Sequence, residues 1–136
     1  MRTMKKTYHG SCHCGAVRFE ADLDLSGETS KCNCSICRKG RFWKSIAKAD
    51  EFRLTAGEDA LTEYGFRGMI THFFCRRCGI KPFGRGFMEE LGGTFYGVNL
   101  ACLDDATDEE LAEAPIVFQD GLHDNWQNPP AETRYL

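Results

Sequence analysis

The sequence has no run of about 18 apolar residues, the length that spans a membrane. It also has no excess of basic charge: the formal net charge of -3 at pH 7 argues against general nucleic-acid binding, which needs a basic surface. The first residues, MRTMKKTYHG, include basic ones, but no apolar stretch follows them, so we expect no signal peptide. The sequence therefore predicts a cytoplasmic protein that binds neither membranes nor nucleic acids.

Internal repeats, low-complexity tracts and Ser/Gly-rich linkers are also absent. The 136 residues fit one domain, long enough to bury a core of its own. The hydrophobic share of 42% and the charged share of 27% are ordinary for a globular protein. We therefore expect a single domain over residues 1–136.

Helical patterns are scarce, and most apolar segments have the pattern of β-strands. Residues 16–22 alternate, with Val17, Phe19 and Ala21 on one face and charged residues on the other. Further segments rich in aromatic and β-branched residues are expected to be strands: 43–48, 52–55, 61–66, 69–75 and 94–103. Glycines scattered between such short segments are typical of a mainly β domain.

One helix is expected over residues 105–114, with Thr107 or Asp108 as its cap, acidic residues in its first turn and Pro115 after its end. The tail that follows, from residue 119 to 136, has no regular pattern. We expect its Trp126 and Tyr135 to cover the core rather than to take part in chemistry.

Cysteine, by contrast, is abundant, with eight residues in a chain for which we expect no export signal. In a reducing compartment disulfides rarely persist, and clustered thiols are more often metal ligands or redox groups. Cysteines in C-x-C pairs also make poor disulfide frameworks. The sequence therefore favours metal binding over a disulfide scaffold.

Two of the cysteine pairs suit a closed metal site. Cys12 and Cys14 form a C-x-C pair whose thiols project to one face if they lie on a strand. Cys75 and Cys78 form a C-x-x-C knuckle, and Gly79 permits the backbone twist after it. Together the pairs predict a structural zinc site with four thiolates, which would staple two distant parts of the chain.

A third group, in the segment KCNCSICRKG, has only three cysteines: Cys32, Cys34 and Cys37. Three protein ligands with an exchangeable fourth position are typical of a catalytic zinc, and thiolates favour zinc over magnesium or calcium. Cys102 could close this site, although a lone cysteine in an apolar segment is more often a core residue. Zinc deaminase, H-E-x-x-H protease and thioredoxin-like patterns do not fit the sequence.

Positive charge gathers around the cysteines. Residues 31–48 include six basic residues and no acid, and residues 75–87 include four and no acid. This charge either compensates a zinc–thiolate centre, which is formally negative, or attracts an anionic small ligand. Basic side chains that could hold such a ligand are Arg38, Lys39, Arg41 and Arg85. His72 and His123 could carry protons, but a structural histidine is the commoner case.

The segments GSCHCGAVRFEA, CNCSICRKG, FFCRRCGIKPFGRG and YGVNLACLDD, in this order, resemble the glutathione-dependent formaldehyde-activating enzyme family, which includes centromere protein V. The resemblance covers about residues 8–126. It implies a mainly β fold, a β-tent of small antiparallel sheets held by zinc, with little helix. It also implies a structural zinc on Cys12, Cys14, Cys75 and Cys78, and a catalytic zinc on Cys32, Cys34 and Cys37.

The resemblance further implies a carbon–sulfur lyase that adds the thiol of glutathione to formaldehyde or a related aldehyde, giving S-(hydroxymethyl)glutathione. Glutathione and an aldehyde would then be the small-molecule partners. Two alternatives are a non-catalytic zinc-binding module of the same fold, which binds an acidic protein partner through residues 31–48, and a thiol-based metal store or redox sensor.

Overall fold

A computed structural model of the protein describes residues 5–66 and 70–136. Its smaller sheet has three antiparallel strands in the order β1-β2-β5. These strands are β1 (Lys6–Ser11), β2 (Arg18–Leu23) and β5 (Phe52–Ala56). The expected strand over residues 16–22 thus begins two residues later and ends one residue later, as β2.

The larger sheet has seven strands in the order β10-β3-β4-β9-β8-β7-β6 within the described residues. Their bounds are β3 (Thr29–Cys32), β4 (Trp43–Lys48), β6 (Leu61–Phe66), β7 (Ile70–Cys75), β8 (Phe83–Met88), β9 (Gly93–Asn99) and β10 (Ile116–Gln119). All neighbours are antiparallel except β10, which pairs in parallel with β3. The mainly β prediction is confirmed, and the larger sheet is mixed. Met69, the expected first residue of a strand, lies outside the described residues.

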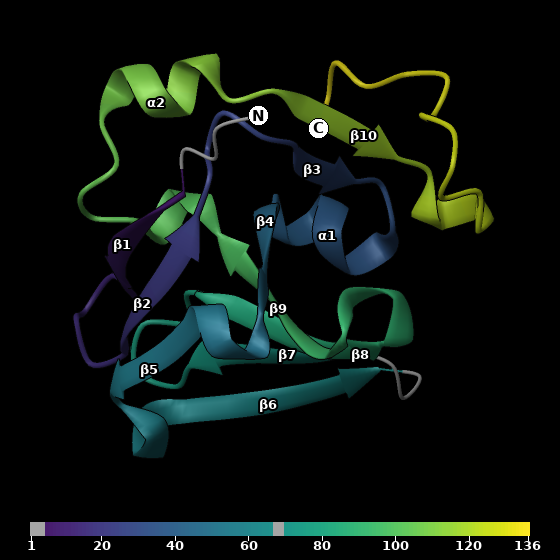
Figure 1. Ribbon diagram of the computed structural model, residues 1–136. Helices are drawn as coiled ribbons and strands as arrows, with labels where there is room; N and C mark the ends of the chain where they lie inside the picture. The colour runs from purple at the N-terminus through teal and green to yellow at the C-terminus, as the bar shows by residue number, and fades with distance from the viewer. Residues whose placement is uncertain (1–4, 67–69) are drawn as a thin grey trace.

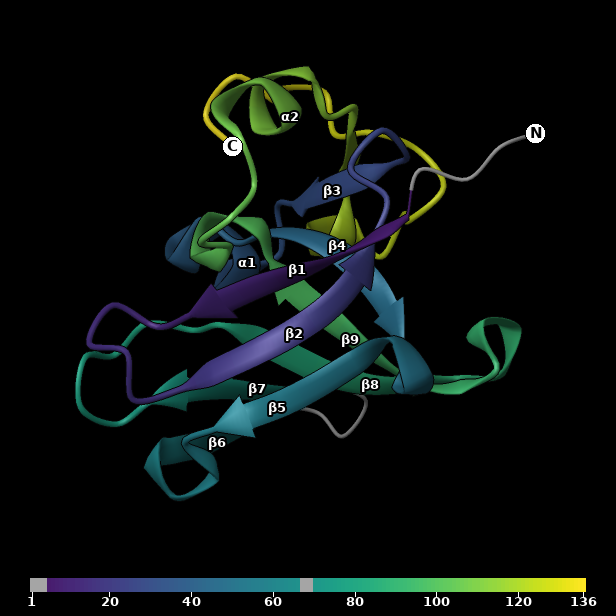
Figure 2. The same cartoon turned by 60° about the vertical axis from the view of Figure 1, so that its left-hand side comes forward.

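The hydrophobic core lies between the two sheets. Figure 2 shows the smaller sheet lying over β7, β8 and β9 of the larger one. The ring of Phe52 joins the two sheets, with its centroid 5.5 Å from that of Phe19, 4.7 Å from that of Phe83 and 4.3 Å from that of Tyr96. The alternation of residues 17–21 is confirmed, because the apolar side chains of this segment are buried.

Helices are short. The expected helix forms as α2 (Asp108–Glu113), and Thr107 is its cap in a reciprocal capping box with Glu110. A second helix, α1 (Ser35–Gly40), follows β3 directly. Single 3-10 turns join other elements: η1 (Ala49–Glu51), η2 (Glu58–Ala60), η3 (Glu89–Leu91), η4 (Leu100–Cys102) and η5 (Gly121–His123). Within residues 5–66 and 70–136, no helix has the length and apolar character needed to cross a membrane.

The tail after β10 runs back over the end of β3 and α1, on one side of the molecule (Figure 1). Arg41 Nη1 donates to the carbonyl oxygen of Tyr135 at 3.1 Å, and Lys31 Nζ lies 3.5 Å from that of Leu136. Trp126 and Tyr135 are 51% and 41% exposed. The expectation that they cover the core is therefore wrong. The tail packs on the polar segment around α1, where its backbone carbonyl oxygens accept hydrogen bonds from basic side chains.

Candidate metal centres

Four cysteines meet where β1 and β7 end. Cys12 and Cys14 follow β1, Cys75 ends β7, and Cys78 lies in the turn after it. All four sulfurs lie within 4.8 Å of one another. Cys14 Sγ is 3.7 Å from Cys12 Sγ and 3.6 Å from Cys75 Sγ. A tetrahedral zinc with bonds of about 2.3 Å places its sulfurs about 3.8 Å apart, whereas a disulfide needs about 2.05 Å. The geometry fits a metal and not a disulfide.

Backbone N–H groups surround these sulfurs. Val17 N donates to Cys12 Sγ at 3.3 Å, and Arg77 N donates to Cys75 Sγ at 3.4 Å. A hydrogen bond from the backbone at Ile80 lowers the pKa of the Cys78 thiol to about 6. Hydrogen bonds of this kind favour the thiolate, the form that binds metals. With four sulfurs, the cluster has the ligands of a closed site.

The second cluster is built on the junction of β3 and α1. Cys32 is the last residue of β3, Cys34 is the N-cap of α1, and Cys37 lies in its first turn. Their sulfurs also lie within 4.8 Å of one another, and Cys34 N donates to Cys32 Sγ at 3.3 Å. In the part of the chain that the structure describes, no fourth His, Cys, Asp or Glu joins this group. We call these three residues the cysteine trio.

The thiols of the trio compete for ionisation. Hydrogen bonds from Cys32 and Cys37 hold the pKa of Cys34 well below its usual range. The pKa of Cys37 is raised, mainly by its contacts with Cys32 and Cys34. Three sulfurs this close cannot all be charged without compensation, since like charges disfavour ionisation. A soft divalent cation supplies that compensation, so the donor set fits zinc.

Asn33, between two cysteines of the trio, ties the trio to the tail. Its Nδ2 donates to Asp120 Oδ1 at 2.8 Å, and its Oδ1 accepts from Leu122 N at 3.0 Å. His123 Nδ1 lies 2.9 Å from the same Asp120 oxygen. The hydrogen bond from Asn33, followed by that from His123, lowers the pKa of Asp120. The buried Asp120 carboxylate therefore holds both Asn33 of the trio segment and His123 of η5 in place.

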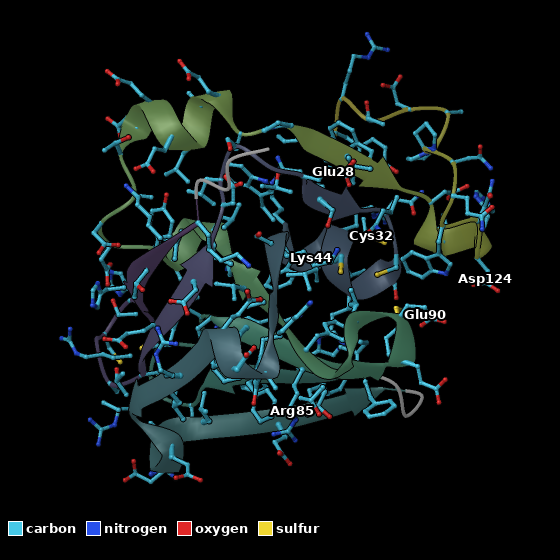
Figure 3. All side chains as sticks on the ribbon, viewed as in Figure 1. Glu28, Cys32, Lys44, Arg85, Glu90 and Asp124 are labelled. Atoms are coloured by element: carbon cyan, nitrogen blue, oxygen red, sulfur yellow. The ribbon has the colours of Figure 1, made fainter. Side chains whose placement is uncertain are left out.

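Two lysines border the trio on the side of the larger sheet. Lys44 Nζ donates to Gln119 Oε1 at 3.2 Å. Lys81 Nζ lies 3.9 Å above the centre of the Phe42 ring and contacts His72. Figure 3 shows Cys32 and Lys44 in the same upper part of the molecule, on the neighbouring strands β3 and β4. The expected gathering of positive charge around the trio is thus present in three dimensions.

The fold places some of the basic residues singled out in the sequence at the trio and others away from it. Arg38 and Arg41 line a small cavity of about 30 Å³ whose lining also includes Cys32 and Cys37, whereas Lys39 is exposed on α1. Arg85 lies far from Cys32 in Figure 3, with its guanidinium 4.9 Å from the centre of the Phe73 ring. Arg85 therefore lies apart from the basic residues that line the cavity at the trio.

Cys102 belongs to neither cluster. It is buried in the hydrophobic core, and its Sγ lies 3.9 Å from the carbonyl oxygen of Lys81. Burial raises the pKa of its thiol to about 12. The interpretation of Cys102 as a core residue is confirmed.

The sequence did not single out Asn33, Lys81 or Asp120. Asn33 stands out only through its place between two cysteines, and Lys81 through its place after the C-x-x-C knuckle. Asp120 is one of nine acids in the last 33 residues, and no local pattern separates it from the others. Residues that these three side chains contact lie on β7, directly before β4 and on η5, and these elements are far apart in the sequence.

The fold and the two sulfur clusters define a mainly β protein with groups of thiols that could hold metal ions. The chain belongs to the glutathione-dependent formaldehyde-activating enzyme family, whose model matches residues 7–120. A Halomonas elongata protein named "Putative glutathione-dependent formaldehyde-activating enzyme" is 32% identical over 78 residues. That match covers 51% of this chain and 50% of the relative, so the chain spans about half of the relative's length.

A solved structure has the same fold. The crystal structure of a Rhodobacter sphaeroides protein is 33% identical to this chain and has a TM-score of 0.67. The similarity covers 80% of this chain and 99% of that protein. The arrangement of sheets described above is therefore shared with a protein whose structure has been determined by experiment.

Proposed function

We propose that the protein is a zinc-dependent carbon–sulfur lyase that adds the thiol of glutathione to formaldehyde or a related aldehyde. Family membership supports the reaction class. One structural observation carries the proposal: the trio brings three sulfurs together with no fourth such ligand among the described residues. A zinc ion held by three protein ligands keeps a position for a substrate.

Each cysteine cluster has its own role in this proposal. Cys12, Cys14, Cys75 and Cys78 would hold a structural zinc, and Cys32, Cys34 and Cys37 would hold the catalytic one. A bound zinc lowers the pKa of a coordinated thiol, which generates the nucleophile at neutral pH. The first cluster supplies no such chemistry, because its four sulfurs fill a tetrahedral site.

The residues around the trio suit an anionic thiol substrate. Glutathione carries net negative charge near neutral pH, and Arg38 and Arg41 flank the small cavity at the sulfurs. Lys44 lies on β4, next to the strand that ends in Cys32, and its Nζ donates to Gln119 Oε1. These cations draw the anion toward the sulfurs and orient its thiol, so binding and positioning come from the chain itself.

The proposal is tested with Cys34→Ala. We expect this variant to lose the zinc of the trio and all catalysis while keeping the fold, because the four-cysteine site is untouched. Cys102→Ala is a matched control, since it removes a buried thiol that belongs to neither cluster. Zinc is quantified by mass spectrometry, and turnover is followed as exchange between formaldehyde hydrate and S-(hydroxymethyl)glutathione by NMR.

Unchanged turnover in Cys34→Ala would rule out the mechanism. A wild-type protein with two coordinatively saturated metal ions and no acceleration of the exchange would instead support the non-catalytic zinc module. Loss of zinc with disulfide formation in the trio under mild oxidation would support the metal store or redox sensor.

A further inference from the structure

His72 and Lys81 form a polar pair on the face of the larger sheet opposite the core. His72 pairs with Gly84 of β8, and Gly84 pairs with Gly97 of β9. A β-carbon built at Gly84 would lie 3.8 Å from Lys81 Cε, and one built at Gly97 would lie 3.4 Å from Lys44 Cδ. Two glycines in adjacent strands therefore leave the space in which the lysine side chains lie.

The ammonium group of Lys81 lies against a residue that is bonded to the helix of the trio. Its Nζ is 2.5 Å from His72 Nδ1 and 3.9 Å from the centre of the Phe42 ring. The backbone N–H of Phe42 donates to the carbonyl oxygen of Cys37 at 3.0 Å, so this ring is fixed to α1. Lys81 also interacts electrostatically with Cys37 and Cys34. The amine thus contacts β7 through His72 and lies within electrostatic range of two sulfurs of the trio.

No acid neutralises this amine: within the described residues, Lys81 makes no ion pair with a carboxylate. The groups that face the pair are the thiols of Cys34 and Cys37 on α1, Lys44 on β4, and Tyr64 on β6, whose ring centroid is 6.3 Å from that of His72. A partly buried cation beside a second cation and a histidine is costly. Such a cation is retained where its charge or its proton is used.

The local electrostatics suit proton transfer. Burial, opposed by the sulfurs of Cys37 and Cys34 and aided by the positive charge of Lys44, lowers the pKa of Lys81 to about 8. Burial and the positive charge of Lys81 lower the pKa of His72 to about 4. His72 is therefore neutral near pH 7 and accepts a hydrogen bond from the Lys81 ammonium. This bond fixes the direction of the remaining N–H groups.

We infer that Lys81 is the general acid of the proposed addition and that His72 is its positioning residue; this inference rests on the proposed function. The thiolate sulfur of glutathione donates an electron pair to the carbonyl carbon, and a C–S bond forms. The π pair of the C=O bond moves to oxygen, which takes a proton from the Lys81 ammonium. The product is the hydroxymethyl thioether, and Lys81 remains as a neutral amine.

The proton balance closes without another reactant. The thiol releases one proton to solvent when it ionises, and Lys81 takes one proton back from solvent after the reaction. In the reverse direction the neutral amine takes the hydroxyl proton of the thioether while the C–S bond breaks and the C=O bond forms. A single amine with a lowered pKa therefore serves both directions, as general catalysis near neutral pH requires.

The test compares Lys81→Met and Lys81→Arg with the wild type in the zinc-loaded protein. Arginine keeps the positive charge but cannot give up its proton near neutral pH. We expect both variants to slow the NMR exchange by about 10²-fold or more. Lys48→Met is the control, because Lys48 is exposed at the end of β4. Zinc content and glutathione affinity by calorimetry check that Lys81→Arg retains metal and substrate.

A readout independent of activity is the NMR titration of the Lys81 side chain. We expect its midpoint below the ordinary lysine value of about 10.4. An exchange rate in His72→Gln equal to that of the wild type would contradict the positioning role of His72. If Lys81→Met or Lys81→Arg exchanges as fast as the wild type, Lys81 is not the general acid, and the proposed function still stands. Absence of acceleration in the wild type overturns the proposed function and this inference together.

Discussion

Gly121 lies directly against the sulfur of Cys32: a β-carbon built at residue 121 would be 2.6 Å from Cys32 Sγ. The same position would be 2.5 Å from the indole of Trp126, so the glycine is enclosed on two sides. Because this approach is closer than any side chain allows, residue 121 must be glycine for the tail to pack on the trio. The tail is thus part of the site.

Replacing Gly121 by alanine is expected to displace Cys32 and to remove zinc from the trio. The four-cysteine site should keep its metal, since it is built from other elements. Metal quantification of Gly121→Ala checks this. Gly40→Ala is the control, because a β-carbon there meets nothing within 4 Å. Retention of the trio's zinc by Gly121→Ala would show that the tail packs differently from the description above.

Loss of a ligand from the four-cysteine cluster is expected to affect stability more than chemistry. In Cys75→Ser we expect the free energy of unfolding to fall by more than about 3 kcal/mol, because metal binding and folding are coupled. Cys75 is fully buried and joins β7 to the segment after β1. Thermal unfolding with and without a chelator measures the effect. A variant as stable as the wild type would contradict a structural role for the cluster.

Asn33→Ala is expected to loosen the trio without removing a ligand. The change leaves the buried Asp120 carboxylate without its amide donor, at a cost of about 1–3 kcal/mol in folding stability. We also expect zinc affinity at the trio to fall about 10–100-fold, as for other groups that orient ligands. Competition with a zinc indicator measures this affinity. Asn128→Ala is the control, since Asn128 Nδ2 donates to the Oδ1 of nearby Asn125. An equal loss of zinc affinity in this control would refute the role of Asn33.

The pH dependence of stability should include a contribution from buried His72. Its pKa of about 4 lies below the ordinary value of 6.5, so the unfolded chain binds more protons between these values. Stability therefore rises with pH in this window, and lowering the pH from 7 to 5 should cost about 2 kcal/mol through His72. Denaturant unfolding at several pH values should show that the stability of His72→Gln depends less steeply on pH than that of the wild type. The same pH dependence of stability in the two proteins would refute the low pKa of His72.

Local patterns predicted those elements whose signal is contained in a few neighbouring residues. The alternation at residues 17–21 fixed the buried face of β2, and the capping residues fixed the start of α2. Strands β1, β3, β8 and β10 were not predicted. Their segments are short, polar or rich in glycine, and they become strands because neighbours in the sheet satisfy their backbone hydrogen bonds.

The sequence alone determined the trio and each of the two cysteine pairs, because their spacings bring thiols together through local turns. The fold then brings the two distant pairs together. Only the tertiary structure decided what surrounds them. His72 comes to this region from β7 and Lys81 from the segment before β8, whereas Asp120 and Gly121 come from the tail. Pairing across the sheet and packing of the tail set these contacts between residues far apart in the chain. No local pattern encodes them, since their partners are chosen by the shape and hydrogen-bonding groups of the folded surface.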